Sequence, residues 1–533
     1  MPLKLEPPLD RPLPLWIVFP VIFIAVYLSH ATLLRLPYYW DEAGYYIPAA
    51  YDFLRTGSLI PSTTLSNAHP PLPSLYLALW WKTSGFSPAV TRTAMCMVAA
   101  LALLAVYGMA LRLNGRASVA IWTTVLTGLY PVWFAQSTMA HADLFAAAGT
   151  LWALNFVLVP EPTRRQLWAG AGFFALAVLA KETAILIPLT LVLYEAWRAA
   201  RGEAHQRLQR AQNAGVLLLP LLPLALWYAY HRARTGFIFG NPEYLRYNAT
   251  SIFTPLRVLV AFAHRAVHLT VHMNLFVPVL CTIAAMLLDP RRDDDGDLRL
   301  RIPLPSQVKI YLLLLANAAG FSLLGGALLT RYLLPMYPLV LLLAVSTFRR
   351  RVRYWQALCA LSAVAFLLGI FINPPYRFAP EDNLAYRDVI LLHQQAVRQI
   401  VLHAPDATVL TAWPASDELG KPEIGYIRKP VHTVTIDNFS AAALARAVAQ
   451  PDSYSAALVF STKYDPPRLP LHMGARYEAS DEQYFGFHHD LSPTEIARML
   501  GGKVTWHGER NGQWAAVLLF DRIRATPLQA YPK

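Results

Sequence analysis

The chain has 533 residues, of which 55% are hydrophobic and only 15% are charged. Soluble proteins are roughly 45–50% apolar and about 25% charged, so this composition excludes a single soluble globular domain and a disordered chain. The formal net charge of +13 could indicate nucleic-acid binding, but most basic residues lie in short loops between apolar runs, where membrane proteins keep their orientation signals. The sequence therefore predicts a polytopic α-helical membrane protein that resides in a lipid bilayer and binds no nucleic acid.

Eleven apolar runs predict membrane-spanning helices, each of which ordinarily needs roughly 20 largely apolar residues. The first run could instead be a signal peptide, because Ser29-His30-Ala31 loosely resembles a cleavage site. The eleven runs cover residues 15–34, 90–111, 117–135, 142–159, 167–180, 183–198, 213–230, 268–288, 307–328, 332–348 and 355–372.

Lys181 and Glu182 interrupt one apolar stretch, which predicts either one span with a buried charge pair or two short spans. Two short spans place the arginine-rich segments 198–210, 291–301 and 349–353 on the cytoplasmic side, where basic residues are enriched. A single span would move all three segments outside. The two-span hairpin is therefore favoured, and it puts Lys181 and Glu182 at the outer membrane face. With a cytoplasmic amino terminus, eleven spans leave the carboxyl terminus outside.

The predicted membrane domain comprises residues 1–372 and includes a long first outer loop at residues 35–89. Across residues 373–533 the composition changes, and helical patterns alternate with short strand-like runs, which is typical of a small α/β layer domain. Helices are predicted at 384–403, 440–449 and 492–500, and strands at 407–412, 431–436, 456–461, 503–507 and 514–520.

The first outer loop opens with two adjacent carboxylates, Asp41 and Glu42, in an aromatic segment from Tyr38 to Tyr46. One interpretation is an aromatic belt at the membrane interface with solvated acids. The other is a carboxylate general base that faces a sugar or a lipid head group. The residues alone leave both interpretations open.

Later in the same loop, His69 is followed by Pro70 and Pro71, just before the apolar segment 75–81. Proline fixes its own φ and biases the preceding residue towards extended backbone, so His69 is predicted to be held rigidly at the membrane face. A lone histidine is usually structural, but the two prolines favour a binding role for His69.

Further polar groups fall in turns on the same predicted outer side. These groups are His141, Asp143, Lys181, Arg331 and Tyr332. Ionisable groups at membrane depth are costly and therefore mark functional sites by default. The structural alternatives are a local salt bridge between Lys181 and Glu182 and snorkelling of Arg331 to the interface. The cations could bind a phosphate and a carboxylate could take a proton, which predicts a site for a phosphate-bearing substrate.

Three histidines, His264, His268 and His272, are spaced four residues apart and would share one face of a helix. His264 and His268 could bind a metal ion. A polar stripe that lines a groove between helices is the favoured interpretation.

Several of these motifs resemble, in the same order, landmarks of the GT-C membrane glycosyltransferases, in particular the glycosyltransferase family 39-like branch of protein mannosyltransferases and aminoarabinose transferases. The resemblance covers roughly residues 1–372 and rests on Asp41-Glu42, His69-Pro70-Pro71-Leu72, Asp143, Ala180-Lys181-Glu182-Thr183 and Arg331-Tyr332-Leu333-Leu334-Pro335. The aminoarabinose branch usually has Glu-Lys before Pro-Pro, where this chain has Ala68-His69. That departure argues against aminoarabinose as the sugar.

The resemblance implies a GT-C fold that transfers a sugar from a polyprenyl-phosphate-linked donor at the periplasmic face of a bacterial-type inner membrane. For this reaction we expect Asp41 to act as the general base, with Glu42 assisting or orienting it. The donor phosphate would be held by His69, Lys181, Arg331 and Tyr332, and the acceptor or a divalent cation would be positioned by Asp143 and His141. The acceptor, which could be a lipid, a glycan or a protein, is not identified.

Two other classes of function stay open at this stage. A transporter or flippase of lipid-linked sugars would favour polar residues near the middle of the spans and related halves of the chain. A non-catalytic membrane scaffold with an outer binding domain would leave the one-sided set of ionisable residues unexplained.

Overall fold

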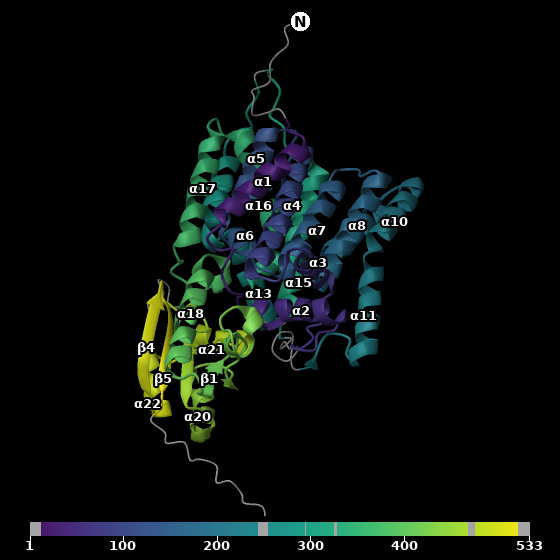
Figure 1. The fold of residues 1–533 in the computed structure, drawn as a ribbon. Helices are drawn as coiled ribbons and strands as arrows, with labels where there is room; N and C mark the ends of the chain where they lie inside the picture. Colours follow the sequence, from purple (N-terminus) through teal and green to yellow (C-terminus); the bar gives the residue numbers. More distant parts are fainter. Residues whose placement is uncertain (1–11, 243–253, 294, 325–327, 467–474, 521–533) are drawn as a thin grey trace, which may run out of the picture.

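The computed structural model describes residues 12–242, 254–293, 295–324, 328–466 and 475–520. A bundle of helices forms the larger part of the molecule, and a smaller domain with a β-sheet lies at one end of it (Figure 1). Helix α1 begins at the opposite end of the bundle. The division of the chain near residue 372 stays a prediction.

Most helices of the bundle overlap predicted apolar runs, whereas the helix at 255–270 lies almost wholly before the run at 268–288. Their bounds are α1 (Leu15–Ser29), α4 (Pro88–Asn114), α5 (Ala117–Leu129), α6 (Pro131–Gln136), α7 (Ala142–Val157), α8 (Arg164–Ala180), α9 (Leu186–Arg201), α10 (Ala204–Leu218), α11 (Leu221–Thr235), α13 (Pro255–Thr270), α14 (Phe276–Met286), α15 (Leu304–Leu323), α16 (Tyr337–Arg351) and α17 (Trp355–Phe371). Short helices precede three of them: η3 (Glu182–Ile185), η4 (His272–Asn274) and η5 (Thr330–Leu333).

Within the described residues, four helical stretches are long and apolar enough to cross a membrane, at 88–114, 182–201, 206–235 and 304–323. The pair 255–274 and 276–286 would add a fifth if it forms one span, and four shorter apolar helices (α1, α5, α7 and α17) coincide with other predicted runs. The helical membrane fold is therefore confirmed, whereas the number of eleven spans stays a prediction.

One predicted run, residues 268–288, is not the straight helix that its composition suggested. The two helices on either side of His272–Asn274 meet at an angle of 99°. Met273 and Asn274 adopt positive φ values of 49° and 66°, a backbone conformation that ends a right-handed helix. Helix α13 thus ends before His272, although the His272 ring still contacts that of His268 with 5.4 Å between centroids.

The long first loop contributes the short helices η2 (Glu42–Tyr46), α2 (Ile47–Thr56) and α3 (Leu72–Ser84). These helices and the sheet domain lie at the same end of the bundle (Figure 1). The loop between α8 and η3 and the short helix η5 also contribute residues to that end, as the contacts below show.

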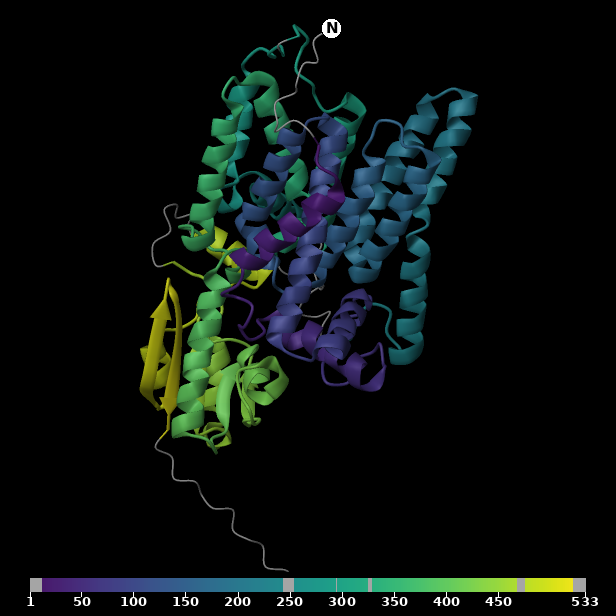
Figure 2. The ribbon, with the colours of Figure 1, turned by 45° about the horizontal axis from the view of Figure 1, so that its top comes forward.

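The sheet domain opens with the long helix α18 (Ala385–His403), which packs against β3, β4 and β5. Figure 2 shows α18 lying along the sheet, with the β4–β5 hairpin at its outer side. The five strands are β1 (Val409–Ala412), β2 (Thr433–Ile436), β3 (Ala456–Phe460), β4 (Lys503–Arg510) and β5 (Gln513–Leu519), and the remaining helices are η6 (Pro380–Asp382), α19 (Ala415–Gly420), η7 (Pro422–Ile424), α20 (Ala441–Val448), η8 (Pro451–Ser453), α21 (Ala475–Phe485) and α22 (Pro493–Leu500).

The strand order is β2-β1-β3-β5-β4. β1 pairs in parallel with β2 and β3, whereas β5 pairs antiparallel with β3 and β4. The central strands β1 and β3 are buried along their whole length, as their continuous apolar sequences require. All five predicted strands and the three predicted helices are present, which confirms the α/β sheet domain.

The sheet domain packs directly on the first loop. The ring of Trp413 lies edge-on to that of Trp40, with 5.2 Å between centroids, and Ile424 accepts a hydrogen bond from the Tyr38 backbone at 3.2 Å. A side chain at Gly44 would place its Cβ only 2.7 Å from the Trp413 ring. Glycine at position 44 is therefore a condition for this close approach.

Candidate active site

Arg331 is the centre of a buried cluster of charges at the junction of the bundle and the sheet domain. Its side chain is 3% exposed, and its two terminal nitrogens donate hydrogen bonds to the carboxylates of Asp41 and Glu381. Its Nε lies 3.4 Å from the carboxylate of Asp143. Burial among three carboxylates excludes the alternative in which Arg331 snorkels to the interface.

Lys181 is the second cation of the cluster. Helix α8 ends at Ala180, and the extended backbone of Lys181 (φ −150°, ψ 123°) carries the side chain away from the helix axis. Its Nζ donates a hydrogen bond of 2.6 Å to Asp143 and lies 4.0 Å from the centre of the Tyr332 ring. Asp143 thus links the two cations that the sequence predicted as phosphate ligands.

The acids of the cluster differ in accessibility. The side chain of Asp41 is 21% exposed, whereas those of Asp143 and Glu381 are 3% and 5% exposed. Asp41 is therefore the most accessible carboxylate of the cluster.

A pocket with about 310 Å³ of empty space opens beside the cluster. Charged residues and Tyr332 line one part of its wall, and the bundle helices α7, α9 and α15 supply apolar residues to the rest. Its lining includes Asp143, Lys181, Arg331, Tyr332, Ile187 and Phe321. Such a pocket suits a ligand that carries an anionic group on an apolar chain.

Glu42 faces the opposite side of the loop from Asp41. Its carboxylate is fully buried, lies 3.3 Å from Arg92 and accepts backbone hydrogen bonds from Tyr39 and Ala140 at 3.0 and 2.7 Å. Arg92 also donates to the carbonyl of Pro37 at 2.6 Å. Glu42 and Arg92 therefore link the backbone of the first loop to that of the loop before α7. In this geometry Glu42 can assist Asp41 only indirectly, by fixing the backbone around it.

Replacement of Glu42 by Ala should lower the free energy of unfolding by about 3–5 kcal/mol, because it leaves the buried Arg92 without its carboxylate. Glu42→Gln keeps an acceptor for the loop amides, so it should destabilise the fold less and should cost less activity than loss of the Asp41 charge. Thermal unfolding in detergent measures the first effect. A Glu42→Ala protein as stable as the wild type but inactive would instead show that Glu42 acts in the chemistry.

His69 and His141 lie close to the cluster but contact other partners. His69 is 2.8 Å from Glu182 and stacks on Tyr46 with 6.0 Å between ring centres. The neighbours Lys181 and Glu182 thus pair with different partners. A second pocket, with about 460 Å³ of empty space, is lined in part by His69 and Tyr46.

His141 precedes α7 and is fully buried. Its Nδ1 is 2.8 Å from the side-chain oxygen of Gln136, and burial lowers the pKa of the imidazole well below its usual value. A neutral His141 can orient its neighbours by hydrogen bonds but adds no positive charge to the site.

The histidines proposed as metal ligands are not brought together with other ligands. His264 contacts the ring of Phe485 and His268 that of His272. Among the residues that the structure describes, no group of three His, Cys, Asp or Glu side chains is placed to hold a metal ion. The predicted metal site at His264 and His268 gains no support from this geometry.

Two residues of this region were missed by the sequence analysis. Arg92 lies within the predicted span 90–111, where a single ionisable residue is itself a signal of a buried partner. Glu381 lies in the segment Pro380–Asp382, where an acid beside another acid is typical of a solvated turn. No pattern in the sequence indicates that Glu381 reaches Arg331.

Comparison with known proteins identifies relatives of both the sequence and the fold. Residues 68–228 match the family model described as dolichyl-phosphate-mannose-protein mannosyltransferase. No match is found among curated proteins.

Two solved structures of ArnT from Cupriavidus metallidurans share the fold. The apo structure superposes with a TM-score of 0.55 at 15% sequence identity and covers 94% of this chain and 97% of that chain. The structure bound to undecaprenyl phosphate gives a TM-score of 0.53 at 16% identity, with 94% and 98% coverage. The fold over nearly the whole chain and the family model over residues 68–228 together confirm the resemblance to GT-C membrane glycosyltransferases of the protein mannosyltransferase type.

Proposed function

We propose that this protein is a membrane glycosyltransferase that moves a sugar from a polyprenyl-phosphate-linked donor to an acceptor at the periplasmic face of a bacterial-type inner membrane. The observation that carries the proposal is the buried pair of cations, Lys181 and Arg331, which faces a pocket with apolar walls and adjoins one accessible carboxylate, Asp41. A lipid phosphate and an acid–base group are the two components that such a transfer needs.

The proposed reaction is a single displacement. The acceptor hydroxyl gives its proton to the Asp41 carboxylate while its oxygen forms a bond to the anomeric carbon of the sugar. The bond between that carbon and the donor phosphate breaks, and its electron pair stays on the phosphate oxygen. Lys181 and Arg331 stabilise the charge that develops on the leaving phosphate. Attack from the face opposite the leaving group inverts the anomeric configuration.

Asp143 and Tyr332 serve this reaction by holding the cations in place. Asp143 contacts both Lys181 and Arg331, and the Tyr332 ring lies under the Lys181 ammonium. His69 and His141 flank the site and are proposed to position the donor and the acceptor. A divalent cation could also be bound.

The comparisons support a lipid-linked donor. The matched family model is named for dolichyl-phosphate-mannose as donor, and one of the similar structures, ArnT, was solved with undecaprenyl phosphate. Neither name identifies the sugar or the acceptor of this chain.

The proposed orientation makes a prediction about reporter fusions. A reporter joined after Asn373 should score as periplasmic and one joined at Asp295 as cytoplasmic, because the arginine-rich segments 198–210, 291–301 and 349–353 then lie inside. Paired alkaline phosphatase and fluorescent protein fusions measure both positions. A cytoplasmic score after Asn373 would exclude both the eleven-span arrangement and a periplasmic site.

The function is tested with a radiolabelled polyprenyl-phosphate-sugar in proteoliposomes, with acceptors extracted from the source membranes. A glycosyltransferase releases polyprenyl phosphate as the label moves to the acceptor, and the Asp41→Asn protein provides the inactive control. Movement of intact donor across the bilayer would instead indicate a transporter. Donor binding without cleavage or movement would indicate a scaffold.

A further inference from the structure

The segment between α17 and α18, residues 372–384, leads from the bundle into the sheet domain, and hydrogen bonds hold it in place. Asn373 and Asn383 are joined by a side-chain hydrogen bond of 3.0 Å, and Asn383 accepts one of 2.9 Å from the backbone of Ala385. Gln136 of the bundle donates to the backbone oxygen of Glu381 at 3.3 Å. The short helix η6 is thereby held at a defined position beside the charge cluster.

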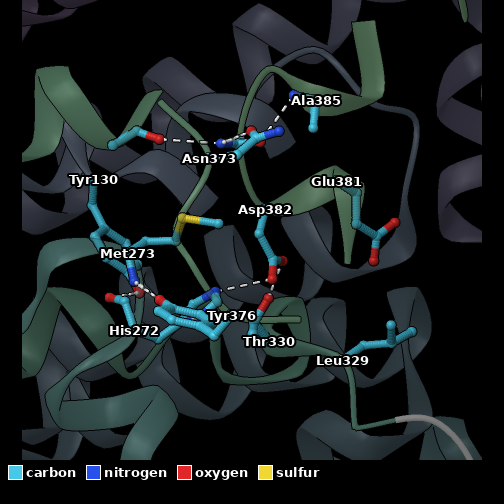
Figure 3. A network of polar contacts seen from close by, with 12 residues as sticks. Tyr130, His272, Met273, Leu329, Thr330, Asn373, Tyr376, Glu381, Asp382 and Ala385 are labelled. Carbon is cyan, nitrogen blue, oxygen red and sulfur yellow. Dashed lines mark hydrogen bonds and ion pairs between the residues drawn. The ribbon is translucent and has the colours of Figure 1, made fainter. Parts of the chain in front are cut away.

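Two neighbouring acids of η6 point in different directions, as Figure 3 shows. Asp382 accepts a hydrogen bond from Thr330 and lies 3.0 Å from His272, so each of its carboxylate oxygens has a partner within the scaffold. The hydroxyl oxygen of Tyr376 lies 3.2 Å from the other ring nitrogen of His272, Nδ1, within hydrogen-bond distance. Asp382 is therefore an anchor, and it leaves Glu381 free to face Arg331.

Glu381 uses only half of its carboxyl group in this contact. One oxygen accepts the hydrogen bond from Arg331, and the other is buried without a hydrogen-bond partner among the described residues. A buried, half-satisfied carboxyl group is costly. The unfavourable burial of Glu381 next to Arg331, a predicted phosphate ligand, indicates that Glu381 has a role in the site.

The balance of charge suggests what that role is. The cluster contains the carboxylates of Asp41, Asp143 and Glu381 against the cations Lys181 and Arg331. A phosphate that enters this buried site adds further negative charge next to three acids. Arg331 can bind the phosphate only if one of the acids releases its hydrogen bond to the guanidinium. Protonation of that acid removes the repulsion between its carboxylate and the phosphate.

Building on the function proposed above, we propose that Glu381 is a positioning residue that holds Arg331 ready in the free enzyme, yields it to the donor phosphate and carries a proton in the phosphate-bound state. Phosphate binding therefore takes up a proton from solvent wherever Glu381 is ionised in the free enzyme. Asp41 stays available as the base because it is the exposed acid of the cluster, and Asp143 stays paired with Lys181. The segment that joins the bundle to α18 thereby contributes a residue to the site of the membrane domain.

The surroundings of Glu381 fit this exchange. Burial raises the pKa of Glu381 to about 8, with Arg331 opposing the rise and Asp41, Asp382 and Asp143 adding to it. Tyr39 of the first loop also faces Glu381, and burial raises the pKa of its phenol well above the usual value. Glu381 is therefore placed to change its charge near neutral pH while the tyrosine stays neutral.

Binding of undecaprenyl phosphate to the detergent-solubilised full-length protein tests the inference between pH 7 and 9. The second pKa of a phosphomonoester is about 6, so the charge of the probe hardly changes in this range. Because the pKa of Glu381 lies at about 8, most of the free protein already carries this proton at pH 7, whereas at pH 9 binding must draw most of it from solvent. The Kd of the wild type should therefore rise by up to about tenfold per pH unit above pH 8.

The Glu381→Gln protein should bind with a Kd that is nearly independent of pH, at a value close to that of the wild type at pH 7. Its neighbour variant Asp382→Asn removes an acid that does not touch Arg331 and should keep the pH dependence of the wild type. Calorimetry in buffers of different ionisation enthalpy adds a readout on the wild type alone, which should take up close to one proton per bound phosphate at pH 9.

Three results would overturn the inference. These are a pH-independent Kd without proton uptake in the wild type, an unchanged pH dependence in Glu381→Gln, and loss of binding by Glu381→Gln at pH 7 in a folded protein. A wild type that fails to bind undecaprenyl phosphate at any pH would overturn the proposed function as well. The first three results leave the proposed function intact, so the two failures are distinguishable.

Discussion

Replacement of Asp41 by Asn is expected to lower the turnover of sugar transfer by roughly 10²–10⁴-fold, the usual contribution of a positioned proton-transfer group. The substitution keeps the size and shape of the side chain but removes its negative charge and almost all of its basicity. Donor binding should survive, because Asp41 contacts Arg331 and its loss leaves that cation freer to bind the phosphate. Single-turnover rates and a donor-binding isotherm on the same preparation separate the two effects.

Asp417→Asn is a suitable control for this experiment. The Asp417 side chain is 22% exposed, close to the 21% of Asp41. Its carboxylate pairs with Lys421 and accepts a hydrogen bond of 3.2 Å from the indole Nε1 of Trp413. It should transfer sugar at nearly the rate of the wild type. A fully active Asp41→Asn protein would contradict the base assignment. If a chelator inhibited the wild type as strongly as the mutation does, Asp41 would instead be the ligand of a divalent cation.

The second large effect is expected at Arg331. Arg331→Lys keeps the charge but loses the planar fork that contacts Asp41 and Glu381 together. Loss of one hydrogen bond between charged groups costs about 1.5–3 kcal/mol, which corresponds to a loss of roughly ten- to a hundredfold in kcat/KM. Steady-state kinetics at limiting donor measures this loss.

Arg331→Ala should lower the stability of the protein as well as its activity. It leaves the buried carboxylates of Asp143 and Glu381 without a shared cation, so we expect destabilisation by about 3–5 kcal/mol in addition to the loss of activity. Lys181→Ala should weaken donor use with a smaller effect on folding, because only Asp143 loses a direct ion-pair partner. Full activity of Arg331→Lys at limiting donor would exclude a role for the guanidinium fork in phosphate binding.

Much of the cluster could be predicted from the sequence because single ionisable residues at the ends of apolar runs are rare and costly. Asp143, Lys181 and Arg331 each interrupt an apolar context, and a bilayer forces such residues to the same surface when their turns lie on one side. The structure brings all three together with Asp41. The strands of the sheet domain were predictable for a similar reason, because their apolar runs are short and bounded by turn residues.

The rest of the site could not be predicted because it depends on docking between segments that are distant in sequence. Asp41 and Glu42 look equivalent in the sequence, yet the turn at Trp40, with φ of 46°, directs one to Arg331 and the other to Arg92. Glu381 is separated from Arg331 by 50 positions and by a whole helix pair. The periodicity of the local sequence does not indicate which acid of a loop will pair with which cation of the bundle.

The insertion of η6 into the charge cluster has a consequence for engineering. The predicted membrane domain ends at residue 372, but contacts of the charge cluster continue beyond it, because Glu381 pairs with Arg331 and Trp413 packs on Trp40 of the first loop. A chimera that exchanged only the sheet domain for that of a relative would also exchange a ligand of Arg331 and the ring that covers Gly44. A chimera should therefore keep the donor specificity of its membrane domain only if the junction lies after Ala385 and the native Trp413 is retained.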